Sequence, residues 1–150
     1  MSRLYPDRPI VGVGAVIWRG DQLLLIRRGK PPRVDQWSLP GGAQQLGETL
    51  NEAITREVRE ETGLEMTDVR LLTAVDLIER EPDGRVRYHY TLVDFTAEAL
   101  HGEPIAGDDA AAVGWFAMSE LPDLGLWSET IRIVEEAATA RRRPTAGAKY

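Results

Sequence analysis

Apolar positions along this chain follow two spacings, one typical of strands and one typical of helices. Residues 11–18 and 23–28 are rich in apolar and β-branched side chains and are separated by a turn at 19–22, which predicts a hairpin. Residues 68–80 and 85–97 form two longer extended runs around Pro82, Asp83 and Gly84, which predicts a second hairpin. A further strand is predicted at 112–117 and a final helix at 128–140.

Between the two hairpins, apolar side chains recur at the spacing of a helix. The members of this stripe are Leu50, Ala53, Ile54 and Val58. Thr49, with Glu52 three residues later, has the pattern of a capping box, and Gly63 is placed to end the helix in a left-handed conformation. The ends of this helix are therefore predicted from the sequence alone.

The predicted order is two strands, a turn region with a possible short strand, a helix, three strands and a helix. Two helices flanking a mixed sheet indicate an α+β sandwich. We expect one domain over residues 8–140, preceded by an N-terminal extension at 1–7. Residues 141–150 are basic, have no apolar periodicity and are predicted to be a disordered tail.

Acidic side chains continue the apolar stripe toward the end of the central helix. They are Glu57, Glu60 and Glu61. Carboxylates packed against a protein body are costly unless cations neutralise them, and hard divalent metals prefer oxygen ligands. These residues predict a metal site, although the segment at 56–61 taken alone also fits an ordinary charged helix.

The wider spacing argues against an ordinary charged helix. Seven fixed identities and two aliphatic positions would co-occur by chance less than roughly once in 10⁹ windows at average residue usage. The pattern resembles the Nudix box, and all of its specified positions match. They are Gly42, Glu48, Arg56, Glu57, Val58, Glu60, Glu61, Gly63 and Leu64.

This resemblance implies the Nudix fold, an α/β/α sandwich around a mixed β-sheet, and a metal-dependent attack of water on a pyrophosphate. The implied cofactor is Mg²⁺, with Mn²⁺ as a substitute. Glu57 and Glu61 are the first expected ligands, Glu60 completes the set, and the Gly41 carbonyl is a further oxygen donor. No covalent intermediate is expected.

Two more residues of the box are expected to support the carboxylates. Arg56 is placed to orient one of them, although a surface ion pair explains it equally well when it is taken alone. Glu48 precedes the helix cap and is expected behind the ligands, with a contribution to metal binding.

The general base is expected either in the box helix or in a later loop. Asp108 and Asp109 lie in that loop, where many relatives have a Glu, and an ordinary turn explains them too. We place Asp109 among the catalytic candidates.

Three residues are candidates for substrate contact. Arg27, at the end of the second strand, is a candidate phosphate clamp, chosen over its neighbour Arg28. Trp37 is expected either to stack on a base or to anchor packing. His89 is expected either to be a partly buried structural residue or to contact substrate, and it faces away from Tyr88 and Tyr90.

Composition limits the partners and the location. With 24 acidic and 18 basic residues the formal charge is −6, which argues against nucleic-acid polymers and anionic membranes. The absence of cysteine excludes disulfides, thiolate catalysis and Cys-rich zinc sites. The sequence has no secretory signal and no apolar run of membrane-spanning length, so we expect a cytoplasmic protein. Homodimers are common in the family that the box resembles, so a homodimer is a further candidate state.

The leading functional hypothesis is cleavage of a nucleoside diphosphate linked to another moiety, with ADP-ribose or another ADP-sugar first. The run WSLPGG before the box supports this assignment by its resemblance to ADP-ribose pyrophosphatases. The same run also resembles triphosphate pyrophosphohydrolases that remove oxidised nucleotides. A non-catalytic nucleotide sensor is the third hypothesis, and the intact glutamates argue against it.

Overall fold

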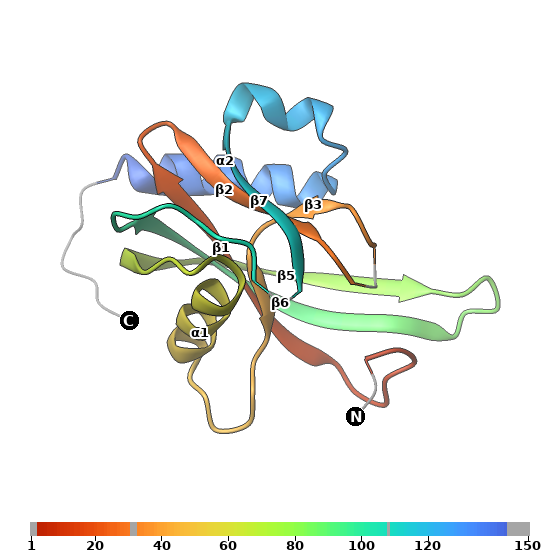
Figure 1. Ribbon diagram of the computed structural model, residues 1–150. Coiled ribbons are helices and arrows are strands. Elements are labelled where there is room, and N and C mark those ends of the chain that lie inside the picture. The colour runs from red at the N-terminus through yellow and green to blue at the C-terminus, as the bar shows by residue number, and fades with distance from the viewer. Residues whose placement is uncertain (1–2, 31–32, 108, 144–150) are drawn as a thin grey trace.

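The computed structural model describes residues 3–30, 33–107 and 109–143. Both predicted hairpins and both predicted helices are present (Figure 1). The elements are β1 Ile10–Arg19, β2 Gln22–Arg28, β3 Trp37–Ser38, β4 Gly41–Ala43, α1 Leu50–Thr62, β5 Met66–Arg80, β6 Val86–Ala99, β7 Ala110–Ala117, the 3-10 helix Met118–Asp123 and α2 Ser128–Arg141.

The strands form one mixed sheet in the order β3-β2-β1-β6-β5, to which β4 adds on β1 and β7 adds on β2. β1 runs parallel to β6, from the pair Ile10 and Tyr90 to the pair Trp18 and Glu98. The other pairings are antiparallel. Segments about 80 residues apart in sequence therefore lie side by side at the centre of the sheet.

The two helices cover opposite faces of this sheet (Figure 1). Val13, Ala15 and Ile17 of β1 pack with buried residues of α1, whereas Val16 and Trp18 pack with buried residues of α2. Because both faces are covered, β1 is an almost continuous buried run instead of an alternating one. The predicted α/β/α sandwich is confirmed.

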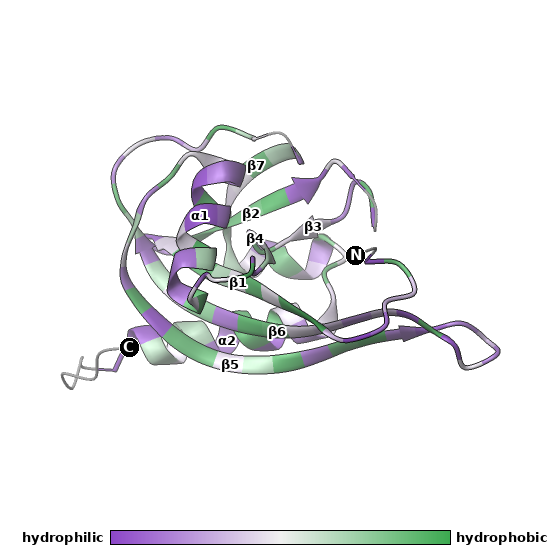
Figure 2. Cartoon of the chain, turned by 90° about the horizontal axis from the view of Figure 1, so that it is seen from below, coloured by the Kyte–Doolittle hydropathy of each residue, from purple (hydrophilic) through white to green (hydrophobic). Residues whose placement is uncertain are grey.

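The β5–β6 hairpin extends beyond the helices (Figures 1 and 2). In Figure 2, β5 alternates between hydrophobic and hydrophilic residues, as expected for a strand with one covered face. The N-terminal extension is bound to the hairpin, since Tyr5 donates its backbone N–H to the Arg87 carbonyl at 2.8 Å and its hydroxyl to Glu81 at 2.7 Å.

Two predictions of element boundaries need correction. The turn region before α1, where at most one short strand was expected, contains two, β3 and β4. Arg141, expected in a disordered tail, is the last residue of α2, and it donates hydrogen bonds to Glu98 at 2.7 and 2.8 Å and to the Gly20 carbonyl at 2.6 Å. The rest of the predicted tail, from 144 on, lies outside the described residues. Among the helices the structure describes, none is long and apolar enough to cross a membrane.

Candidate active site

Helix α1 has both predicted caps. The Thr49 hydroxyl accepts from the Glu52 N–H at 3.1 Å, and the Glu52 carboxylate accepts from the Thr49 N–H at 2.9 Å. Gly63 has a φ of 73° and donates to the Arg59 carbonyl, which ends the helix. These local interactions fix the length and start of the helix that carries the acidic residues.

The three acidic residues of α1 differ in burial. Glu61 is 7 % exposed and lies in line with Ala53, Ile54 and Val58, which are fully buried. The Glu57 side chain is 14 % exposed, whereas that of Glu60 is 58 % exposed. The acidic continuation of the apolar stripe is thus present at Glu61 and Glu57, and Glu60 lies at its solvent edge.

Burial raises the pKa of Glu61 to about 8. Its carboxylate accepts a hydrogen bond from the Gly41 N–H at 2.7 Å, which lowers the pKa, while the charge on Glu57 raises it again. Arg28 lowers and Asp109 raises the pKa of Glu61 through their charges. Arg28, at the end of β2, and Asp109, just before β7, therefore both act on the Glu61 carboxyl group.

Arg56 joins the carboxylates of the box. Its guanidinium donates to Glu48 at 2.6 and 2.9 Å, to Glu57 at 2.8 Å and to Glu60 at 3.2 Å. A further bond at 3.0 Å reaches the Ala43 carbonyl of β4. The bonds to Glu48 and Glu57 raise the pKa of Arg56, and the same pairing lowers the pKa of Glu48. The contacts fit the predicted orienting role of Arg56 and the predicted position of Glu48 behind the ligands.

Two glycines allow β4 to lie between β1 and α1. A Cβ atom at Gly41 would collide with the Val13 carbonyl, and one at Gly42 would collide with the Glu57 carboxyl group. Glycine is required at both positions by close approach. The Gly41 N–H donates to the Glu61 carboxylate at 2.7 Å, and the role of the Gly41 carbonyl as a metal ligand stays a prediction.

A cleft of about 210 Å³ borders the other side of β4, between the sheet and α2. Gly41 and Gly42 form one border, and Arg28 also lines the cleft. Its aromatic side chains are Trp37, Tyr88, Tyr90 and Trp127. The cleft and the carboxylates of α1 thus meet at a single short strand.

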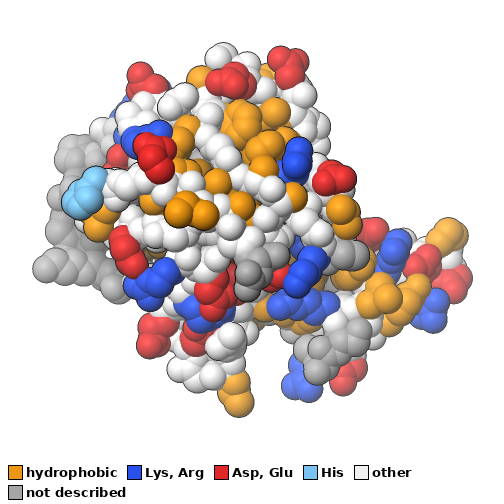
Figure 3. Space-filling view, viewed as in Figure 1, with side chains coloured by type: hydrophobic (Ala, Val, Ile, Leu, Met, Phe, Trp, Pro, Cys, Tyr) orange, Lys and Arg blue, Asp and Glu red, His pale blue; other side chains and the backbone are white. Residues whose placement is uncertain are grey.

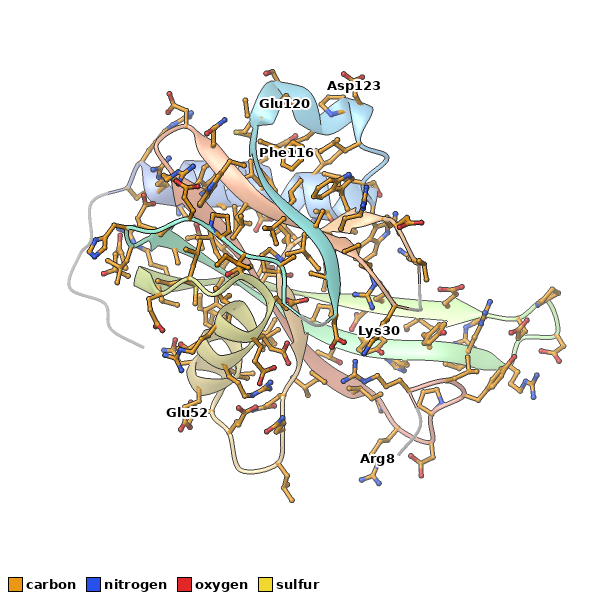
Figure 4. All side chains as sticks on the ribbon, in the orientation of Figure 1. Arg8, Lys30, Glu52, Phe116, Glu120 and Asp123 are labelled. Atoms are coloured by element: carbon orange, nitrogen blue, oxygen red, sulfur yellow. The ribbon has the colours of Figure 1, made fainter. Side chains whose placement is uncertain are left out.

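The cleft contains Trp37 but not Arg27. Trp37 lines the cleft and packs edge to face against Phe116, labelled in Figure 4, with ring centroids 4.9 Å apart. Both interpretations of Trp37 are therefore compatible with its position. The Arg27 guanidinium lies over the Trp37 ring at 5.9 Å, and Arg28, one residue on, lines the cleft.

His89 does not line the cleft, whereas Tyr88 and Tyr90 do. Successive side chains of a strand point to opposite faces, so His89 faces away from Tyr88 and Tyr90, as the sequence predicted, and therefore away from the cleft. Its place on the other face argues against the substrate contact that was considered for it.

Asp109 lies beside the predicted site. Its side chain forms an ion pair with Lys30, labelled in Figure 4, at 2.7 Å, and its carbonyl accepts from the Gly29 N–H at 3.0 Å. The Gly107 N–H donates to the Glu61 carbonyl at 2.9 Å, which ties this loop to the end of α1. Asp108 lies outside the described residues. The role of Asp109 as a base stays a prediction.

One cleft residue, Asp94, was missed by the sequence analysis. It lines the cleft from β6 and is only 4 % exposed. An acidic residue inside the apolar run Leu92-Val93-Asp94-Phe95 was the available signal, because buried carboxyl groups are rare in strands covered on both faces.

Within residues 3–30, 33–107 and 109–143, no three carboxylate or imidazole groups lie close enough together to hold a metal ion. The ligand set of Glu57, Glu60, Glu61 and Gly41 therefore remains a prediction. On the face shown in Figure 3, acidic and basic side chains are interspersed, so the net charge is not gathered into one patch there.

Comparison with known proteins agrees with this geometry. The NUDIX domain model matches residues 8–137. The ADP-ribose pyrophosphatase of Methanocaldococcus jannaschii is 37 % identical over 129 residues, 86 % of this chain and 73 % of that protein. The human 8-oxo-dGDP phosphatase NUDT18 is 31 % identical over 82 % of this chain and 36 % of its own length. The crystal structure of a MutT NUDIX hydrolase from Burkholderia pseudomallei has a TM-score of 0.75 and 35 % identity, over 87 % of this chain and 98 % of that one. The chain therefore belongs to the NUDIX family of hydrolases, which act on pyrophosphate bonds.

Proposed function

We propose that this hydrolase cleaves the pyrophosphate of a nucleoside diphosphate linked to another moiety, with ADP-ribose or another ADP-sugar as the first candidate, and that it uses Mg²⁺. The observation that carries the proposal is the buried Glu61 beside Glu57, separated only by β4 from a cleft with aromatic walls. In this arrangement the carboxylates that would bind the metal ion lie next to the cleft that would bind the nucleoside.

The two carboxylates of Glu57 and Glu61, acting on one another beside β4, favour a divalent cation. Glu61 is buried without a cationic hydrogen-bond partner among those described, and Glu57 adds negative charge that raises the pKa of Glu61 further. Glu57 and Glu61 would hold the ion, with Glu60 and the Gly41 backbone completing the set. When bound, such an ion neutralises phosphate charge and lowers the pKa of a water molecule.

The chain's own residues perform the remaining tasks. Arg56 fixes the Glu57 carboxylate through a bond of 2.8 Å and is itself fixed by Glu48. Arg28 lines the cleft near Glu61 and is suited to bind a phosphate oxygen. The aromatic walls hold the base and exclude water from it. Asp109, next to the end of α1, is the candidate for accepting a proton from the attacking water.

ADP-ribose is favoured because the archaeal relative at 37 % identity carries the name ADP-ribose pyrophosphatase. An oxidised purine nucleotide is the second candidate, since the human relative at 31 % identity is named an 8-oxo-dGDP phosphatase. Both substrates combine a purine with a pyrophosphate, which matches a cleft for a base beside a cluster of carboxylates.

The test is a substrate panel in Mg²⁺ with product identification in ¹⁸O-labelled water, which shows the phosphorus attacked. The panel contains ADP-ribose, ADP-glucose, 8-oxo-dGTP, 8-oxo-dGDP and dinucleoside polyphosphates. We expect the highest kcat/KM for ADP-ribose and incorporation of the label into one phosphate product. Absence of hydrolysis across the panel would overturn the proposal and favour the sensor.

The matched variants are Glu57→Gln and Glu61→Gln, which remove charge with little change in shape. Each should lower kcat by at least roughly a hundredfold, because a metal ligand is lost. Glu135→Gln, on an exposed position of α2, is the control and should leave kcat unchanged. Activity above a tenth of wild type in both box variants would contradict the assigned role.

A further inference from the structure

Asp94 is a buried carboxyl group at the cleft whose position is not explained by packing. The residue is 4 % exposed, and its Oδ2 atom is buried with no hydrogen-bond partner among the described residues. A buried polar atom without a partner costs free energy, so an apolar residue would be more favourable here if packing alone mattered. Such exceptions in native proteins call for a functional explanation.

The fold makes room for this carboxyl group. Asp94 is paired with Gly14 across the parallel β1–β6 ladder. A Cβ atom at Gly14 would lie 2.7 Å from Asp94 Oδ1, so any other residue at this position would displace the carboxyl group. Gly14 also lines the cleft. The glycine therefore keeps Asp94 in place at the base of the cleft.

The charged neighbours of Asp94 belong to α2. Arg132 lowers the pKa of Asp94 and Glu136 raises it, and burial outweighs both and raises the pKa to about 6. The Arg132 guanidinium donates to Glu129 and Glu136, at 2.6 Å in each case. Its donors are thus directed to α2 carboxylates, and no described side chain forms a hydrogen bond with Asp94 Oδ2.

We propose that Asp94 is a specificity-determining residue, whose carboxyl group binds the amino-bearing edge of a purine held in the cleft. This inference rests on the proposed function, because it takes the cleft as the nucleoside site. The partner that Oδ2 lacks would be an N–H of the base, and the aromatic walls would hold the ring.

Two purines share the required chemistry. A protonated carboxyl group has one donor and one acceptor, which match the N1 and amino group of adenine. An ionised carboxylate accepts twice, which matches the N1–H and amino group of guanine. Because the pKa of Asp94 is raised to about 6, both forms are accessible near neutral pH. Unsubstituted purine has neither the amino group nor an N1–H, so it can make at most one of these bonds.

The test measures dissociation constants of AMP, GMP and purine riboside 5′-monophosphate by calorimetry on the full chain in Mg²⁺. We expect AMP or GMP to bind at least roughly tenfold more tightly than purine riboside 5′-monophosphate, the value of one hydrogen bond to a charged or buried group. AMP as the tighter ligand would identify adenine, and GMP would identify guanine. Equal affinity for all three nucleotides would overturn the proposal without any variant.

Variants then assign the preference to Asp94. Asp94→Leu should abolish the amino preference, and the affinity for purine riboside 5′-monophosphate should fall less than that for AMP or GMP. Asp94→Asn should keep a preference for AMP, since an amide has a donor and an acceptor, and weaken any preference for GMP, since the amide oxygen replaces only one of the two acceptors. Asp76→Asn, exposed on the neighbouring strand β5, is the matched control and should behave as wild type. An amino preference that survives in Asp94→Leu would refute the assignment.

Hydrolysis of ADP-ribose measured in parallel separates the two proposals. A preference for amino-bearing nucleotides without hydrolysis of any panel substrate would retain base recognition and reject the proposed function. Hydrolysis without an amino preference would retain the function and reject the role of Asp94.

Discussion

At the scale of the residue, the environment of Glu61 predicts a pH-dependent effect on stability. Its pKa in the folded protein, about 8, lies above the ordinary value of 4.5. The contribution of this carboxyl group to stability is therefore complete below pH 4.5 and is lost as the pH rises through 8. Without a divalent cation, the ionised form is buried at an energetic cost.

Glu61→Gln should therefore become more stable relative to wild type as the pH rises from 5 to 9, by on the order of a few kcal/mol in EDTA. The amide keeps an acceptor for the Gly41 N–H, so the fold should be retained. Urea denaturation of both proteins at pH 5, 7 and 9 measures the difference. A difference that stays constant across these pH values would show that Glu61 is not held protonated by burial.

Arg28 and Arg27 allow a second comparison of neighbouring residues. Arg28 lines the cleft and acts on Glu61, whereas Arg27 lies over Trp37. Arg28→Gln should lower kcat/KM for ADP-ribose by roughly tenfold or more, because a charged contact to phosphate is lost. Steady-state kinetics should show a smaller effect for Arg27→Gln. The reverse order would restore the assignment first made from the sequence.

The choice between these arginines was not available from the pattern of the sequence. Leu24 of β2 packs under α1, and Leu23 and Leu25 pack under α2, so both faces of the strand are apolar. Because successive side chains of a strand point to opposite faces, Arg27 and Arg28 must lie on different faces of the sheet. The sequence does not indicate which of these faces has the site. For His89 the sequence was sufficient, because the alternation of side chains along a strand places it on the face opposite Tyr88 and Tyr90.

At the scale of the element, predictability follows the range of the interactions. The ends of α1 were predicted because the capping box and Gly63 act within a few residues. Strand β4 was missed, since two glycines and an alanine carry no strand pattern and their pairing with β1 depends on residues about 30 positions away. The acidic residues could be found from sequence, but the strand that separates them from the cleft could not.

The two glycines of β4 should differ when replaced. A Cβ atom at position 41 meets the Val13 carbonyl, which is backbone, whereas one at position 42 meets the end of the Glu57 side chain. Gly41→Ala should lose strand pairing and unfold at a lower temperature. Gly42→Ala should lose less stability but lower kcat by at least roughly tenfold, because Glu57 is displaced.

Thermal unfolding and steady-state kinetics on both variants separate these effects. Gly47→Ala is not a suitable control, since its φ of 87° is itself unfavourable for alanine. Gly29 is not suitable either, because a Cβ atom there would press on backbone atoms of the later loop. Wild type is the reference, and equal losses of stability in Gly41→Ala and Gly42→Ala would contradict the prediction.

At the scale of the whole molecule, the sheet separates two halves of the site. The carboxylates belong to α1 on one face, and the cleft lies toward α2 on the other, with β4 between them. The parallel pairing of β1 with β6 creates the cleft floor, since it joins Gly14 to Asp94. Such long-range pairing is not encoded in a local pattern, which is why the cleft, and the position of Asp94 on its floor, could not be predicted from the sequence.

This separation predicts how metal and nucleoside binding are coupled. Adenosine alone should occupy the cleft and raise the melting temperature by the same amount with or without Mg²⁺, because it has no phosphate to reach the α1 carboxylates. The α,β-methylene analogue of ADP-ribose spans both halves and should bind more tightly when Mg²⁺ is present. Each tenfold gain in affinity adds about 1.4 kcal/mol, or about 3–6 °C in a chain of this size. Thermal unfolding at saturating Mg²⁺ and in EDTA measures both shifts. If the adenosine shift grew with Mg²⁺ as much as that of the analogue, the nucleoside would have to lie on the metal, and the division of the site by β4 would be wrong.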